Sequence, residues 1–402
     1  MLHKPLSAFS YAASASFSSS TAIDRPRTTM ISANDFELAD ATVTVATANG
    51  RQVLPALWLR ERTLDEAARD ATTGQRFFNP HELPADLSLT DVAAKADGFT
   101  ATFSDGFTSD FRFADLALGI DGDASPVERR SWLAEEGPGE IHDWQRLEAS
   151  AAETRRCLGQ FLERGFVILR NTPTERNSIL SVARHFGFVR ETNFGSYFEV
   201  YSRPVSNDLA YRPVPLAPHT DNPYRDPVPG IQLLHCLVNE TTGGQSTLVD
   251  SLSVCERMRK EDPDGYRLLT EIPVGFRFRD PDTHLYDRHP MIETDHDGCP
   301  TGIHYSPRLD ETPLLDAETM VAFHRARQRL GQLLGDARFE LRFTLKPGEL
   351  MMFDNNRVLH GRTGYDPSEG MRHLQGCYID RDAPESLYRM LSATKTERTE
   401  AA

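Results

Sequence analysis

The second half of the chain is dominated by short apolar segments of strand length, separated by turns rich in glycine, proline, aspartate and asparagine. They are IQLLHCLV (231–238), STLVDS (246–251), VGFRF (274–278), GIHYSP (302–307), ELRFTL (340–345), ELMMFD (349–354) and QGCYID (375–380). Many short strands with frequent turn residues are typical of all-β sandwiches and barrels. The sequence therefore predicts a mainly β fold with helices packed outside it.

Helical periodicity occurs in only a few places. Residues 147–165 and 178–187 each carry apolar residues on one face and end at a glycine, which favours helices that stop there. Between them, FVILRN (166–171) reads as a short buried strand. Residues 317–335 form a longer amphipathic pattern that again ends at glycine. We expect these helices to flank the sheets.

The chain divides into segments of different composition. Residues 31–120 predict a small β-rich domain, with hairpins at Asn49-Gly50 and Asp105-Gly106 and a buried phenylalanine face in the second. Residues 121–145 are acidic and rich in glycine and proline, which indicates a linker. Residues 146–392 then hold the larger domain, and 393–402 a disordered tail. We expect the small domain to line part of the active site or to form the interface of a homodimer.

Residues 1–30 cannot build a core, since they are rich in serine and alanine. Two interpretations stay open. The segment is a targeting sequence, which would indicate a mitochondrial protein, or translation starts at Met30 and the protein is cytoplasmic. Either way, the segment does not enter the fold prediction.

Charge and cysteine content exclude several classes of protein. The net charge of −15, from 44 basic and 59 acidic residues, disfavours binding to nucleic acid and to anionic lipid. No apolar run approaches the ~20 residues of a membrane helix. The five cysteines are scattered and form no CxxC pair, which argues against a disulfide framework and a thiolate metal site.

The triplet HTD, with His219 and Asp221, suggests a metal site. Residues i and i+2 project to the same side of an extended chain, so the two side chains can bind one ion. Two histidines and one carboxylate hold Fe(II) on one face and leave other positions open. His360 is the best third ligand, because it follows an apolar strand and lies in a polar turn. The alternative is a surface turn capped by Asp221.

Two further residues fit a carboxylate co-substrate. Arg372 follows His360 by twelve residues, and a guanidinium matches a carboxylate with two parallel hydrogen bonds. Ser246 follows two glycines in TGGQS and offers a hydroxyl to the same group. The alternative for Arg372 is a surface arginine paired with an acidic residue.

With these residues in this order, the chain resembles the taurine dioxygenase superfamily and, more narrowly, its γ-butyrobetaine dioxygenase branch. The branch also includes trimethyllysine dioxygenase and 2-(trimethylamino)ethylphosphonate dioxygenase. The resemblance covers about residues 35–392. It is carried by LPALWLRER (54–62), by residues 207–250 around HTD, by FDNNRVLHGRTGY (353–365) and by RHLQGCYIDRD (372–382).

The resemblance implies a double-stranded β-helix, or jelly roll, as catalytic core. It implies Fe(II) on His219, Asp221 and His360, and 2-oxoglutarate on Arg372 and Ser246. The implied reaction is hydroxylation of a C–H bond with release of succinate and carbon dioxide, and ascorbate is expected to stimulate it.

The branch also implies an aromatic cage for a trimethylammonium group, which has no N–H to donate. Ring faces attract such a cation by up to ~2 kcal/mol each. Matching the motifs assigns the cage to Phe194, Phe198, Tyr211 and Tyr378. The relatives usually have tyrosine and tryptophan where this chain has the two phenylalanines. Plain core packing is the alternative for these two.

Two departures from the branch bear on cofactors and substrate. Cysteines that hold zinc in the relatives are missing after WLR, so we expect no structural zinc, although His81 lies nearby. Asp208 stands where an asparagine helps to bind a carboxylate, and would suit an ammonium group instead. Arg308 could hold a carboxylate or phosphonate. The expected substrate is γ-butyrobetaine or 2-(trimethylamino)ethylphosphonate; the alternatives are trimethyllysine and a betaine bound without turnover.

Overall fold

The computed structural model describes residues 32–39, 41–47, 50–121, 127–201 and 212–400. They form two compact units that divide between residues 125 and 126. Asn49, at the tip of the first expected hairpin, and residues 1–30 lie outside the described residues. Each unit is described by itself below.

The smaller unit contains two three-stranded antiparallel sheets, β1-β2-β3 and β4-β5-β6. Its elements are η1 (Ala33–Asp35), β1 (Phe36–Ala39), β2 (Thr42–Thr47), β3 (Gly50–Val53), α1 (Ala56–Glu61), η2 (Pro80–Glu82), β4 (Leu89–Ala94), β5 (Gly98–Phe103), β6 (Thr108–Arg112) and α2 (Phe113–Asp121). The hairpin of β5 and β6 turns at Gly106, which has a φ of +85°. Phe99, Phe103 and Phe111 are buried in the core of this unit, as the alternating sequence predicts.

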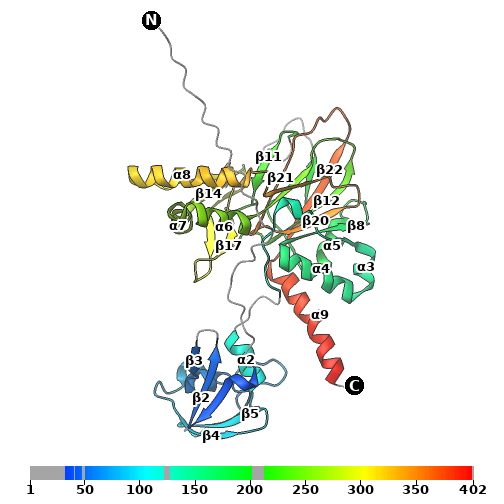
Figure 1. Ribbon diagram of the computed structural model, residues 1–402. Coiled ribbons are helices and arrows are strands. Elements are labelled where there is room, and N and C mark those ends of the chain that lie inside the picture. Colours follow the sequence, from blue (N-terminus) through cyan, green and yellow to red (C-terminus); the bar gives the residue numbers. More distant parts are fainter. Residues whose placement is uncertain (1–31, 40, 48–49, 122–126, 202–211, 401–402) are drawn as a thin grey trace. The chain divides into compact units, whose positions relative to one another are not determined.

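The larger unit is built on two main sheets (Figure 1). The large sheet has the order β10-β22-β12-β20-β8-β7, with β9 on β22, and the small sheet has the order β11-β21-β13-β19. Their strands are β7 (Ile141–Asp143), β8 (Phe166–Arg170), β9 (Val189–Arg190), β10 (Phe198–Tyr201), β11 (Leu216–His219), β12 (Ile231–Asn239), β13 (Ser246–Asp250), β19 (Glu340–Phe343), β20 (Leu350–Asp354), β21 (Val358–Arg362) and β22 (Arg372–Ile379).

The chain passes repeatedly between these two sheets. It forms β7 to β10 in the large sheet, β11 in the small sheet and β12 in the large sheet. It then forms β13 and β19 in the small sheet and alternates through β20, β21 and β22. This alternation defines a double-stranded β-helix. The predicted mainly β fold with a jelly-roll core and a small β-rich N-terminal unit is confirmed.

Both faces of the large sheet are covered, which explains its almost continuous apolar strands. Odd-numbered β12 residues such as Ile231 and Leu233 pack beneath helices, whereas Leu234 and Cys236 point between the two sheets. The covering helices are α3 (Trp144–Ala149), α4 (Ala151–Arg164), α5 (Ser178–Phe186) and α9 (Asp382–Glu400). The space between the sheets is therefore the place where the larger unit can hold a site.

The remaining helices and short strands lie beside the core, in the part of the unit that contains α8 (Figure 1). They are η3 (Ala134–Glu136), α6 (Ser251–Glu261), α7 (Pro263–Glu271), β14 (Val274–Arg279), β15 (His284–His289), β16 (Ile292–Thr294), β17 (Pro300–Ile303), β18 (Asp310–Glu311) and α8 (Ala317–Leu334). The helices expected at residues 178–187 and 317–335 are present and end next to Gly187 and Gly335. The helix expected at residues 147–165 is divided at Ser150, whose backbone is extended, into α3 and α4, and α4 ends next to Gly165. None of the helices in the described residues is long and apolar enough to cross a membrane.

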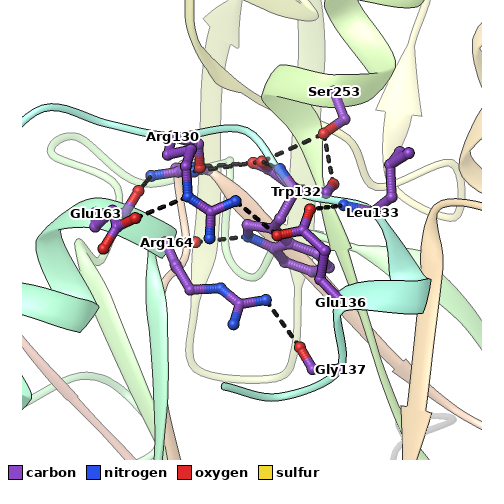
Figure 2. Close-up of polar contacts among 10 residues, drawn as sticks. Arg130, Trp132, Leu133, Glu136, Gly137, Glu163, Arg164 and Ser253 are labelled. Carbon is purple, nitrogen blue, oxygen red and sulfur yellow. Dashed lines mark hydrogen bonds and ion pairs between the residues drawn. The ribbon is translucent and has the colours of Figure 1, made fainter. Parts of the chain in front are cut away.

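Two segments differ from their expected character. Residues 127–145 belong to the larger unit, although their composition indicates a linker. The reason is Trp132, which is 1% exposed and whose indole Nε1 donates to the Arg164 carbonyl at 2.7 Å (Figure 2). Helix α9 continues to Glu400, beyond the expected end at residue 392, and no proline or glycine follows Pro384 of its first turn.

Further polar contacts fix residues 127–145 to the larger unit (Figure 2). Arg130 pairs with Glu136 at 2.6 Å and with Glu163 at 2.7 Å. The Ser253 hydroxyl donates to the Trp132 carbonyl at 2.6 Å. These bonds join the segment to α4 and α6.

A buried ion pair lies beneath this segment. Arg357 Nε donates to Asp250 Oδ1 at 3.0 Å, and both side chains are at most 1% exposed. The other guanidinium nitrogens donate to the carbonyls of Glu163 at 2.8 Å and Arg130 at 2.7 Å. Asp250 in turn accepts from the Trp132 backbone N–H at 3.0 Å. One guanidinium thus joins β13, α4 and the start of the unit.

Replacing Arg357 by methionine should lower the free energy of unfolding of the larger unit by about 3–5 kcal/mol, because Asp250 would stay buried without its partner. Arg342→Met is the control, since the Arg342–Glu340 pair has an arginine that is 53% exposed and should contribute less than about 1 kcal/mol. Urea denaturation followed by circular dichroism measures both. Equal losses in the two variants would contradict the role given to Arg357.

Candidate metal centre and co-substrate site

His219, Asp221 and His360 converge at the open end of the small sheet. Strand β11 ends at His219, which lies directly opposite His360 of β21 in the antiparallel register. His219 Nε2 is 3.4 Å from Asp221 Oδ1, and His360 Nε2 is 3.9 Å from the same oxygen. Ligands about 2.1 Å from one ion and at right angles to each other lie about 3 Å apart, so the three groups fit a metal after small adjustments.

The donor set is in the state that a divalent metal needs. His219 Nδ1 donates to the Ala217 carbonyl at 2.9 Å, which leaves Nε2 as the metal-binding atom. Burial and the neighbouring His219 lower the pKa of His360 to about 3. The charge of Asp221 acts in the opposite direction and only partly offsets them. The His360 imidazole can therefore offer a lone pair near neutral pH. No other group of three potential ligands occurs in the described part of the chain.

Asp221 stays ionised although it lies in the interior. Burial alone would raise its pKa, but His360, His219 and the Tyr378 hydroxyl outweigh burial and hold the pKa well below its usual range. Tyr378 Oη donates to Asp221 Oδ2 at 2.7 Å, which leaves Oδ1 facing the two imidazoles. This hydrogen bond fixes the rotation of the carboxylate.

Asn355, which the sequence interpretation missed, holds the backbone of Asp221. Its Oδ1 accepts from the Asp221 N–H at 2.7 Å, and its Nδ2 donates to the carbonyls of Asp221 and Pro229, both at 2.9 Å. Asn355 is 0% exposed and lies in the turn that leads into β21 and His360. One amide thus connects the two segments that carry the metal ligands. The asparagine pair in FDNNRV is visible in the sequence, but its partner is not.

Arg372 is buried without a counter-ion among the described residues. It is 6% exposed, and its Nε has no hydrogen-bond partner there. Its guanidinium lies 5.5 Å from the Tyr365 ring and so close to Gly244 that a Cβ at that glycine would be 2.7 Å from Nε. Burial lowers the pKa of Arg372, which is the signature of a charge awaiting a partner. An added dicarboxylate would supply it.

Ser246 is buried in β13, two residues after Gly244, and lies opposite Arg362 of β21. The described contacts do not join it to Arg372. Arg362 is also buried, but it donates to the Arg212 and Val214 carbonyls, which distinguishes it from Arg372. Ser246 and the Arg372 guanidinium therefore both lie near the TGGQS loop.

Three of the four proposed cage residues come together next to Asp221. The ring centroids of Phe198 and Tyr378 are 5.4 Å apart, and those of Phe194 and Phe198 are 6.5 Å apart. Phe198 lies over Gly376, where a Cβ would be 2.3 Å from its ring. Tyr211 and Asp208 lie outside the described residues.

Two further aromatic residues, not expected from the sequence, extend this cluster. Phe278 of β14 lies 5.7 Å from Phe194, and Tyr224 stacks on Phe278 at 5.1 Å. Tyr224 follows HTD by three residues, which is the only local signal for it. Arg308 is exposed, and its charge contributes to the low pKa of His360, so it lies on the side of the metal centre.

Comparison with known proteins agrees with this arrangement. Residues 128–378 match the family described as "Taurine catabolism dioxygenase TauD, TfdA family". A γ-butyrobetaine dioxygenase of Pseudomonas sp. (strain AK-1) is 34% identical, over 87% of this chain and 93% of its own length. Dioxygenase str8 of Strobilurus tenacellus is 30% identical, over 86% of this chain and 88% of its own length.

Two more distant similarities are found. A trimethyllysine dioxygenase of Meyerozyma guilliermondii is 26% identical, over 81% of this chain and 87% of its own. Among solved structures, the PvcB protein of Pseudomonas aeruginosa is 18% identical, with a TM-score of 0.45 over 64% of this chain and 93% of that chain.

Replacing Asn355 by alanine should weaken metal binding by about 10–100-fold, because the Asp221 backbone would lose both of its hydrogen bonds to this amide. Titration with Mn(II), a redox-stable substitute for Fe(II), followed by calorimetry gives the affinity. Asn356→Ala is the matched control, since Asn356 is a buried asparagine of the same turn whose side chain makes only a 3.5 Å contact with Gly230. A similar loss of affinity in both variants would show that Asn355 has no special role.

Proposed function

Because the chain belongs to the TauD, TfdA family of dioxygenases, we propose that it hydroxylates a C–H bond of a small trimethylammonium acid. The first candidates are γ-butyrobetaine and its analogue 2-(trimethylamino)ethylphosphonate. The observation that carries this proposal is the aromatic cluster of Phe194, Phe198 and Tyr378, whose tyrosine is hydrogen-bonded to Asp221. A cation held by this cluster would lie next to the metal centre.

His219, Asp221 and His360 would hold Fe(II), since they are the neutral imidazoles and the ionised carboxylate that this ion prefers. When bound, iron with 2-oxoglutarate and dioxygen supplies the oxidising chemistry, and one oxygen atom goes to the substrate and the other to succinate as carbon dioxide leaves. The protein positions the reactants. Tyr378 orients the carboxylate ligand, and the two sheets exclude water from the space between them.

Arg372 would bind the distal carboxylate of 2-oxoglutarate, and Ser246 would assist with its hydroxyl. The buried guanidinium supports this assignment, because an unpaired buried charge is strongly destabilising and a carboxylate would compensate it. A bidentate pair of this kind also fixes the direction in which the co-substrate lies.

The substrate's two ends would meet different groups. The trimethylammonium group would lie against Phe194, Phe198 and Tyr378, with Tyr211 as the fourth wall. The acidic end would face Arg308, whose guanidinium lies on the side of the metal centre. Asp208 favours a substrate with an additional ammonium group, so trimethyllysine is the second candidate, consistent with the name of one relative.

We also propose that the protein forms a homodimer and is located in the cytoplasm or the mitochondrion. Light scattering of the full chain tests for the homodimer. Cell fractionation distinguishes a cytoplasmic enzyme from a mitochondrial one. Neither result bears on the chemistry of the site.

The deciding experiment measures succinate formed by the purified protein with Fe(II), ascorbate and 2-oxoglutarate. γ-Butyrobetaine, 2-(trimethylamino)ethylphosphonate, trimethyllysine and taurine are offered in turn, and His219→Ala is the control. We expect one trimethylammonium compound to stimulate turnover in the wild type only. Stimulation by taurine alone would refute the cage. Binding of a betaine without succinate formation would identify a non-catalytic binder.

Replacing Phe198 by leucine should raise the KM for the trimethylammonium substrate by about tenfold, because a ring face that attracts the cation is lost. A neutral isostere, with carbon in place of the quaternary nitrogen, should be affected much less. Phe198→Tyr keeps the ring and should restore affinity for the cation. If leucine impairs the charged and neutral compounds equally, Phe198 acts only by packing.

A further inference from the structure

Gln232 interrupts the apolar inner face of β12 with a buried polar group. The side chain is 1% exposed, and its Oε1 has no hydrogen-bond partner within the described residues. The following residues on this face are Leu234 and Cys236. Buried polar atoms in native proteins almost always have a hydrogen-bond partner. The unpaired amide of Gln232 therefore suggests that a bound ligand supplies the missing partner. If the side-chain amide is rotated so that Oε1 and Nε2 exchange places, the N–H donor takes the position of the unpaired oxygen.

The register places Gln232 beside the metal centre. It lies directly opposite Tyr378 of β22 on one side and Phe353 of β20 on the other. Side chains that are opposite in an antiparallel sheet share a face, with Cβ atoms about 5 Å apart. Tyr378 is bonded to Asp221, and the Phe353 ring lies 4.9 Å from the His360 ring. The amide is therefore flanked by the two residues that contact the metal ligands.

The same face leads from Gln232 towards Arg372. Leu234 lies opposite Gly376, and Cys236 lies opposite Leu374. Burial raises the pKa of Cys236 to about 12, while the nearby Arg372 guanidinium acts in the opposite direction. The inner face thus offers an amide at the metal end, apolar groups in the middle and a guanidinium at the far end. 2-Oxoglutarate has the complementary order of a keto acid, two methylene groups and a carboxylate.

We propose that Gln232 is a further binding residue for 2-oxoglutarate, whose keto-acid end at the metal accepts a hydrogen bond from the Gln232 amide. The inference rests on the proposed co-substrate and adds the contact at the end opposite to Arg372. It explains why an unpaired amide stands in an otherwise apolar row. The alternative partner of the Gln232 amide is a water molecule bound to the metal. The experiment below distinguishes this water from the co-substrate.

Gln232→Met tests the proposal, because methionine keeps the length of the side chain and removes its polar atoms. Gln375→Met is the matched control. Gln375 is 0% exposed, lies on the neighbouring strand and faces the other way, where it accepts from the Asn177 N–H at 3.0 Å and donates to Glu199 at 3.1 Å. Three quantities are measured for each protein: the Tm without ligands, the Mn(II) affinity, and the 2-oxoglutarate affinity of the Mn(II)-loaded protein by calorimetry.

We expect opposite results for the two glutamines. Gln232→Met should keep or raise the Tm, because an unsatisfied buried group is removed, and should weaken 2-oxoglutarate binding about tenfold with little change in Mn(II) affinity. Gln375→Met should lower the Tm, since satisfied bonds are lost, and should bind 2-oxoglutarate like the wild type. Gln232→Leu serves as a second apolar variant if methionine does not fold.

Unchanged 2-oxoglutarate affinity in a folded Gln232 variant would overturn the inference and leave the proposed function intact. Loss of Mn(II) affinity alone would also overturn it, because the amide would then serve a metal-bound water. A wild-type protein that binds neither Mn(II) nor 2-oxoglutarate would instead refute the proposed function. The outcomes are therefore distinguishable.

Discussion

The pairing of β11 with β21 is the constraint on which the site depends. It places His219 directly opposite His360, and the ladder is irregular between Leu216 and His219. Because side chains alternate along a strand, a shift of one residue would turn His360 away from its partner. The neighbouring strand β13 holds β21 over its full length, from Val358 to Arg362. The sheet therefore fixes the relative positions of these two histidines.

Polar groups in the core fall into two kinds. Asp250, Arg357 and Asn355 have their hydrogen bonds satisfied by the protein and hold segments together. Gln232 and Arg372 keep atoms without partners. Unsatisfied buried atoms reduce stability, so their presence between two sheets is informative. The first kind holds segments of the fold together, and we propose that Gln232 and Arg372 take their missing partners from the co-substrate.

Much of the site follows from local sequence. The spacing of His219 and Asp221 is a local pattern, and so are the glycines that end α4 and α5. The sequence predicts a polar turn at His360, whereas the structure places this residue in the middle of β21, because the ladder with β13 continues to Arg362. Gln232, Asn355 and Phe278 could not be found in this way, because their meaning depends on strand register and on contacts between distant segments. Composition likewise indicated a linker at residues 127–145, where one buried tryptophan decides the structure.

Gly376 has a consequence for how substrate preference can change. Phe198 and Gly376 are opposite each other in the ladder, and the ring fills the space that a side chain at 376 would need. A larger residue at 376 is compatible only with a smaller one at 198, or with a ring that has moved. The volume beside the aromatic cluster is thus shared between two strands. Libraries for altered selectivity should vary these positions jointly, and related sequences should show them changing in step.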